Sequence, residues 1–193
     1  VRGGPLRLKE RDCYLVMNRQ CALALTISDN RYMGMDSISL IDLWEGWQVT
    51  RSPMRLMPLG GTGLPPSSLR GSARAGRGYG LLFQHEGEGR TLHAHMDRFR
   101  DGQALDAQIL LTQEPEESIV MCTPFEKPGQ FYFNQKINCM RAQGKVTLGD
   151  REYVFDPEDS FAVLDWGRGV WTCRGTWYWG SASGMVDGVP FGF

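Results

Sequence analysis

The residues best suited to chemistry gather between Leu164 and Gly180. This stretch, LDWGRGVWTCRGTWYWG, contains four of the six tryptophans of the chain, with one aspartate, two arginines and four glycines. Tryptophan has a large apolar ring and one N–H that needs a partner, so clusters of it often line pockets or close the wet end of a core. The stretch therefore predicts a cavity and leaves open what enters it.

One acidic and one basic residue stand inside the tryptophan-rich stretch. Asp165 is expected on a strand over Phe161–Trp166, and Arg168 follows three residues later across Gly167. An acid on an apolar face needs a partner, which this guanidinium can provide across a tight turn. Two interpretations stay open: a structural ion pair, or a catalytic Asp165 that donates or accepts a proton with its pKa set by the surrounding indoles.

The later tryptophans have the spacing of a strand. Trp177 and Trp179 alternate with Tyr178, so both indoles lie on one face, and Trp171 is expected beside them. Ordinary core packing and the lining of a pocket explain this spacing equally well.

The histidines suggest a metal site but do not complete one. His93 and His95 lie two residues apart and share the solvent-facing side of a predicted strand, opposite an apolar side. The chain has only one other histidine, His85, whereas a catalytic metal site normally needs three protein ligands. We therefore expect no metal and no cofactor.

The elements that must position these residues are short strands bounded by turn residues, which predicts an all-β barrel or sandwich. The expected strands are Leu23–Ser28, Ser37–Leu43, Tyr79–Gln84, Thr91–Met96, Ala107–Thr112, Ser118–Cys122, Lys145–Leu148, Glu152–Phe155 and Phe161–Trp166. Sustained helical periodicity is absent, and one helical turn near Pro157–Ser160 is the most that the sequence allows.

Residues 57–78 interrupt this series of short predicted strands. They are rich in glycine, proline, serine and arginine, and they predict a long mobile loop or a lid over the cavity. The arginines of the loop could contact phosphates, but few aromatic residues accompany them. We expect no nucleic-acid partner.

Composition narrows the function further. A length of 193 residues suits a single β-rich domain over 1–193, and a formal net charge of −1 argues against a polyanionic partner. No apolar run reaches the roughly 20 residues of a membrane span. Five cysteines without a C-x-x-C pair predict free thiols and a cytoplasmic protein. The ends of the sequence suggest a fragment that continues beyond residue 193.

Four motifs carry a resemblance to a known family. They are NQKINCM at 134–140, YVFDPEDSFAVLDWG at 153–167, LDWGRGVW at 164–171 and DGVPFGF at 187–193. With these motifs the chain resembles the bacterial domain of unknown function 2804 family from about Lys9 to Phe193. Thr172 and Cys173 depart from the family pattern, which has a proline and an aromatic residue there.

The resemblance implies a fold but no established activity. The family is similar to lipocalin-like proteins such as carotenoid hydratases and tocopherol cyclases, which implies antiparallel barrels and the N-terminal part of a two-barrel protein. It further implies that four indoles line a lipophile site, that Asp165 protonates an alkene, and that two polar residues of the 134–140 motif add contacts. The indoles are Trp166, Trp171, Trp177 and Trp179, and the polar residues are Lys136 and Asn138.

Three functional hypotheses result. The first is a protein that binds a hydrophobic small molecule or lipid, with Asp165 and Arg168 in structural roles. The second is a cofactor-independent enzyme of the hydratase or cyclase kind that acts on an isoprenoid or lipid, with Asp165 as general acid. The third is a scaffold whose indoles fill a core. Binding is favoured over catalysis because no second titratable group is placed to work with Asp165.

Overall fold

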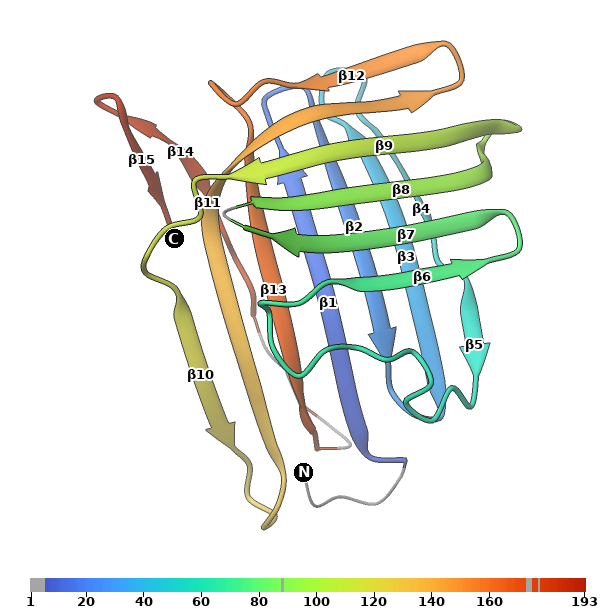
Figure 1. The fold of residues 1–193 in the computed structure, drawn as a ribbon, viewed down its shortest axis with the longest axis vertical. Coiled ribbons are helices and arrows are strands. Elements are labelled where there is room, and N and C mark those ends of the chain that lie inside the picture. The colour runs from blue at the N-terminus through green and yellow to red at the C-terminus, as the bar shows by residue number, and fades with distance from the viewer. Residues whose placement is uncertain (1–5, 88, 173–174, 177) are drawn as a thin grey trace.

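The computed structural model describes residues 6–87, 89–172, 175–176 and 178–193, and within these ranges the regular elements are strands (Figure 1). Their bounds are β1 Leu8–Met17, β2 Cys21–Asp29, β3 Met33–Asp42, β4 Trp47–Arg51, β5 Met54–Leu56, β6 Ser72–Gly76, β7 Tyr79–Glu86, β8 Gly89–Arg100, β9 Gln103–Thr112, β10 Ile119–Pro124, β11 Phe131–Leu148, β12 Arg151–Phe155, β13 Phe161–Val170, β14 Ser183–Val186 and β15 Val189–Gly192. The prediction of an all-β protein is confirmed.

Each of the nine expected segments overlaps a strand of the structure, whereas the strand spacing expected at the later tryptophans is wrong, since Tyr178 and Trp179 lie outside the strands. The expected segments fall in β2, β3, β7, β8, β9, β10, β11, β12 and β13. The sequence pattern missed β1, β4, β5, β6, β14 and β15. Residues 157–160 form a single turn and not a longer helix, as the sequence allows: the amides of Asp159 and Ser160 both donate to the carbonyl of Asp156, and the bond from Ser160 has the spacing of one helical turn.

The strands pair along an open path. The order in the large antiparallel sheet is β4-β3-β2-β1-β13-β11-β9-β8-β7-β6, with β10 and β12 also paired to β11 and β5 paired to β3. Strands β14 and β15 form a separate hairpin. Across the described ranges, β4 and β6 do not pair with each other, so the expected closed barrel is not formed by the pairing.

The long strand β11 belongs to both halves of this sheet. Its first part, through Ile137, pairs with β13 and β10. Met140 and Arg141 still pair with β13, and from Arg141 onward the strand pairs with β9 and then also with β12. The register shifts between Ile137 and Met140, where Cys139 has a φ of 60°. A bulge of this kind bends a strand, which lets one strand turn a corner between two packed layers.

The core lies between these two layers. In Figure 1, β6–β9 run crosswise in front of β1, β2 and β3. Buried apolar side chains from both layers form one cluster, to which β1, β2 and β13 contribute Tyr14, Leu25 and Leu164 while β8 and β9 contribute Leu92 and Ile109. Along β13, Ala162, Leu164 and Trp166 join this cluster, so the core takes the even-numbered side chains of that strand.

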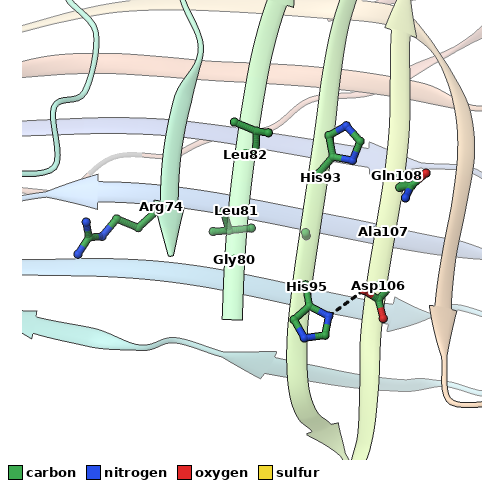
Figure 2. A pocket seen from close by; sticks show the side chains of 10 residues that line it. Arg74, Gly80, Leu81, Leu82, His93, His95, Asp106, Ala107 and Gln108 are labelled. Atoms are coloured by element: carbon green, nitrogen blue, oxygen red, sulfur yellow. Dashed lines mark hydrogen bonds and ion pairs between the residues drawn. The ribbon is translucent and has the colours of Figure 1, made fainter. Parts of the chain in front are cut away.

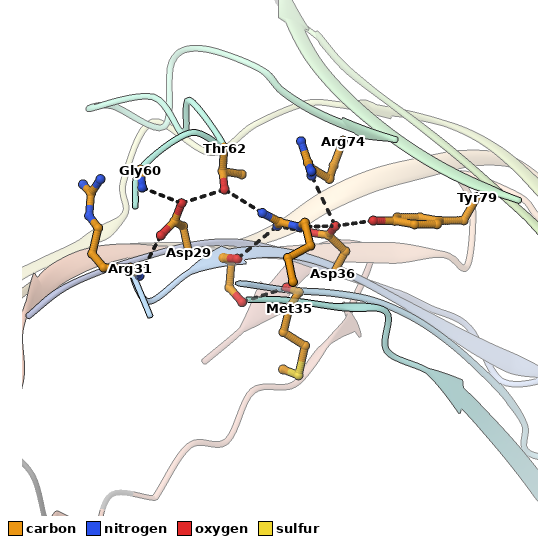
Figure 3. A network of polar contacts seen from close by, with 10 residues as sticks. Asp29, Arg31, Met35, Asp36, Gly60, Thr62, Arg74 and Tyr79 are labelled. Atoms are coloured by element: carbon orange, nitrogen blue, oxygen red, sulfur yellow. Dashed lines mark hydrogen bonds and ion pairs between the residues drawn. The ribbon is translucent and has the colours of Figure 1, made fainter. Parts of the chain in front are cut away.

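Four buried carboxylates face the interior at one end of the core. They are Glu10, Asp12, Asp29 and Asp36. Residues 55–79 supply partners to three of them. Ser72 donates to Asp12. Figure 3 shows the network around the other two, in which Thr62 and the amide of Gly60 donate to Asp29 at 2.7 and 3.1 Å, and Arg55 and Tyr79 donate to Asp36 at 2.8 Å. Buried charges need such partners.

These contacts give the 57–78 segment a defined place. Part of it is β6, which pairs with β7, and the backbone amides of Met57 and Leu59 donate to the carbonyls of Tyr32 and Arg31 at 3.0 Å. Arg74 adds an ion pair with Asp36 at 3.6 Å. The segment closes the polar end of the core through buried contacts, and its mobility stays a prediction.

Asp12 gives this end a pH dependence. Burial raises the pKa of its carboxyl from 3.8 to about 6, although the hydrogen bond from Ser72 and the charge of Arg90 oppose the shift. The folded state therefore holds a proton here that the unfolded chain has lost. The extra proton bound by Asp12 stabilises the folded state fully below the unfolded pKa of 3.8. This contribution to the free energy of unfolding disappears as the pH rises through about 6.

We expect Asp12→Asn to stabilise the protein at neutral pH by on the order of 3 kcal/mol, because the amide keeps an acceptor for Ser72 without a buried charge. The difference from the wild type should shrink toward zero as the pH falls to about 4. Denaturant unfolding across this pH range measures it, with the exposed Asp101→Asn as the charge-matched control. A constant difference at every pH would contradict this account.

Candidate functional site

The side of β13 that faces away from the core carries Asp165. Because side chains alternate along a strand, Asp165, Gly167 and Gly169 lie opposite Trp166 and Arg168. The registers place Arg11 of β1 and Asn134 of β11 on either side of Gly167. This outer face is where the candidate site is built.

The Asp165 carboxylate joins three adjacent strands. One of its oxygens accepts from the guanidinium of Arg11 and the other accepts from the ammonium of Lys136. Asp165 is 7% exposed, so the two cations offset the cost of burying its charge. Both oxygens of the carboxylate are thereby engaged with cations.

The expected pairing of Asp165 with Arg168 is wrong. Arg168 lies on the core side of β13 and forms an ion pair with Glu10, which also binds Arg31 at 2.8 Å. The prediction failed because Gly167 was taken as a turn, whereas β13 continues through it and puts Asp165 and Arg168 on opposite faces.

Two glycines of β13 lie beneath the floor of the site, where neighbouring residues pack directly on them. A Cβ on Gly167 would approach the ring of Tyr132 to 2.7 Å, and one on Gly169 would approach the backbone oxygen of Phe131 to 2.2 Å. Tyr132 therefore packs directly over β13. Its ring meets Trp171 edge to face, with 5.1 Å between centroids.

Asn134 is the most unusual residue of this floor. It is 1% exposed, it lines the cavity above the glycines, and neither atom of its amide has a hydrogen-bond partner among the described residues. Buried amides are nearly always paired, so an orphan of this kind calls for a specific explanation.

A cavity of about 510 Å³ lies over this face, which we call the Asp165 pocket. The chain that follows β13 returns over it, so aromatic side chains meet the charged floor. Its walls are Lys9, Arg11, Met121, Thr123, Phe125, Tyr132, Asn134, Lys136, Asp165, Trp171, Thr172, Gly175, Thr176, Tyr178 and Trp179. The rim of the pocket is exposed to solvent, since Tyr178 is 97% exposed and Trp179 is 45% exposed.

The structure brings four of the residues expected at the site into this pocket and places three elsewhere. Asp165, Lys136, Trp171 and Trp179 line it. Trp166, Arg168 and Asn138 do not belong to its walls, and Trp177 lies outside the described residues.

Trp166 is a core residue. It is 4% exposed, and its ring contacts that of Phe133 at 5.7 Å between centroids. The expectation that Trp166 shares a ligand-binding face with the later indoles is wrong, because the even-numbered side chains of β13 face the core. Asn138 lies at the bulge of β11, where its amide donates to the carbonyls of Ala182 and Phe193 at 3.0 and 2.8 Å and anchors the β14–β15 hairpin.

Burial shapes the chemistry beneath the pocket. Burial raises the pKa of Tyr132 to about 12, with the charge of Asp165 adding to the effect. Burial also raises the pKa of the Cys13 thiol, which accepts a hydrogen bond from Thr26. Tyr132 and Cys13 are therefore neutral groups at physiological pH.

The histidines lie at a second, more open hollow on the outer face of β7, β8 and β9 (Figure 2). As expected, His93 and His95 face away from the core. His95 is held by Asp106 at 2.7 Å and Asp97 at 3.1 Å, and these contacts, that to Asp106 above all, raise its pKa. Within the described residues no group of three or more metal-ligating side chains converges.

Sequence reasoning missed the cations and the amide that complete the Asp165 pocket. Lys9 and Arg11 belong to β1, and Asn134 and Tyr132 belong to the first part of β11. The polar-apolar alternation LKERDCYLVM of β1 was the available signal. It was obscured because Glu10 and Asp12 are acids that face inward.

A family described as Domain of unknown function (DUF2804) matches residues 1–193. The chain belongs to this family. No curated protein matches it. Among the described residues of this DUF2804 chain, none forms a helix long and apolar enough to cross a membrane.

Solved structures also resemble the DUF2804 chain in fold. One of them is a crystal structure of a protein assigned as AttH from Nitrosomonas europaea, with a TM-score of 0.50 and 9% sequence identity. The alignment covers 89% of this chain and 54% of the other, so the chain spans about half the length of that protein. At this identity the likeness concerns the fold alone.

The opposite positions of Trp166 and Trp171 lead to a testable contrast. Trp166→Leu should lower the free energy of unfolding by about 3 kcal/mol, because it leaves a cavity in the core. Trp171→Leu should cost about 1 kcal/mol or less, since Trp171 lines a cavity that already exists. Urea denaturation of both variants measures the contrast, and equal losses would place both indoles in the core.

Proposed function

We propose that this protein binds a hydrophobic small molecule or lipid in the Asp165 pocket. The observation that carries the proposal is a cavity of about 510 Å³ that combines an aromatic wall with buried polar groups at its floor. Ligand sites in proteins have this size and this composition, in which apolar walls give affinity and a few polar groups fix orientation.

The aromatic wall supports an apolar ligand. Tyr132 and Trp171 meet edge to face, and Phe125 and Trp179 extend the same wall toward solvent. The hollow of about 490 Å³ at His93 and His95 lacks such a wall, since the one large apolar side chain on its outer face is Leu82. An apolar ligand therefore gains more at the Asp165 pocket.

The contacts of Asp165 favour binding over acid catalysis. Protonation of an alkene requires a carboxylic acid with its proton directed at the substrate. Asp165 accepts from Arg11 on one oxygen and from Lys136 on the other, an arrangement that stabilises the carboxylate. Asp165 is in this proposal a structural link between three strands.

The scaffold hypothesis has less support. If the indoles only filled a core, no open cavity would be expected beside them, and buried amides would be paired. Instead there is a cavity, and Asn134 lines it without a hydrogen-bond partner in the described part of the chain.

Native mass spectrometry with organic extraction should detect a lipophile that co-purifies with the protein, and titration with a panel of lipids and isoprenoids should quench tryptophan fluorescence. Trp171→Leu should weaken binding by about tenfold, because a buried aromatic contact is lost. Leu82→Ala, at the second hollow, is the control and should leave affinity unchanged. If nothing co-purifies and no lipid of the panel quenches fluorescence, the scaffold hypothesis is the better one.

A further inference from the structure

We propose that the ligand of the Asp165 pocket is an amphiphile with a carboxylate head, held by Lys9 and Asn134 next to Arg11. This inference rests on the proposed function and adds the chemical class of the ligand. It depends on two observations that are independent of the aromatic wall: the charge of the pocket and the orphaned amide.

The charges that line the pocket do not cancel. Lys9, Arg11 and Lys136 are cationic, and Asp165 is the acid among the described wall residues. Asp165 is shared between Arg11 and Lys136. Lys9 forms no ion pair within the described ranges, and its ammonium lies 5.1 Å from the centroid of the Trp171 ring. A pocket with surplus positive charge favours an anion.

The amide of Asn134 needs a ligand group. Whichever way the amide is turned, it offers two N–H donors and one carbonyl acceptor to the cavity. A carboxylate accepts from the N–H donors, and a water that enters with the head can serve the carbonyl oxygen. Leaving such a group buried and unpaired costs about 1–3 kcal/mol, so a ligand that pairs with it gains part of that cost.

The sheet places the cations and the amide within reach of one head group. Arg11, Gly167 and Asn134 lie in one row across β1, β13 and β11, and Lys9, Gly169 and Tyr132 lie in the next row. Adjacent strands are about 4.8 Å apart, so the rows span about 10 Å. Lys9, Arg11 and Asn134 all line the same cavity, so one small head group can lie between them.

The aromatic wall sets the direction of the tail. With the head beside Lys9 and Asn134, the tail lies against the aromatic walls of the same pocket, which include Trp171, Phe125 and the partly exposed Trp179. A single acyl chain with a free carboxylate has this shape: one charged end and one flexible apolar end.

The test compares ligands that share a chain and differ in the head. Lauric acid should bind about tenfold more tightly than lauryl alcohol or methyl laurate at neutral pH, as measured by isothermal titration calorimetry. Lys9→Met should remove most of this preference and leave the affinity for methyl laurate unchanged. Lys145→Met, a change of the same charge at an exposed residue on the far part of β11, should leave the preference intact.

Asn134→Leu separates a ligand role from a structural role. Since it replaces an unpaired buried amide with an apolar side chain of similar size, the variant should be as stable as the wild type or more stable. It should nevertheless bind lauric acid severalfold more weakly. A variant that loses stability would show that Asn134 is a structural residue and would overturn its assignment here.

The outcomes distinguish the two proposals. Equal affinity for the acid, the alcohol and the ester would overturn the carboxylate inference and leave a hydrophobic binding protein. A preference for the acid that survives Lys9→Met would overturn the role of Lys9. Failure of all three ligands to bind would count against the proposed function itself.

Discussion

The bend in β11 is the constraint on which the rest of the structure depends. Around the bulge at Asn138 and Cys139 the strand changes partner, because its pairing with β13 ends at Arg141, where its pairing with β9 begins. One strand thus belongs to both layers that enclose the single core. On the outer face before the bulge, side chains of β10 and of the residues that follow β13 line the Asp165 pocket. Asn138 strengthens the corner by binding the β14–β15 hairpin.

The strands that the sequence predicted are those whose inward residues are apolar. Leu23, Leu25 and Ile27 of β2 alternate with partly exposed residues, and this period was readable. Strand β1 has the same period, but its inward positions include Glu10 and Asp12, which look like solvent-facing residues. Their partners come from Arg31, Arg168 and Ser72, far away in the sequence. A local sequence pattern does not indicate contacts between residues that are distant in the sequence, so β1 and the placement of residues 57–78 could not be predicted.

The candidate site could be predicted in part. Asp165, Trp171, Trp179 and Lys136 were singled out and do line one pocket. The error was to group residues by proximity in the sequence, since the two-residue period of a strand already separates Asp165 from Trp166 and Arg168. Applied consistently, that rule would have excluded Trp166. Asn134 could not have been found, because it stands out only through its burial without a hydrogen-bond partner among the described residues.

The arrangement of Asp165 explains how a pocket can be both charged and apolar. Two cations satisfy the carboxylate, so its burial beneath an aromatic wall is tolerable. The same contacts fix Arg11 and Lys136 in place, and they leave Lys9 as the cation able to respond to a ligand. A pocket organised in this way has charge at one end and hydrophobic surface at the other. Asp165 links β1, β13 and β11 in the register that brings Lys9 and Asn134 to the same cavity.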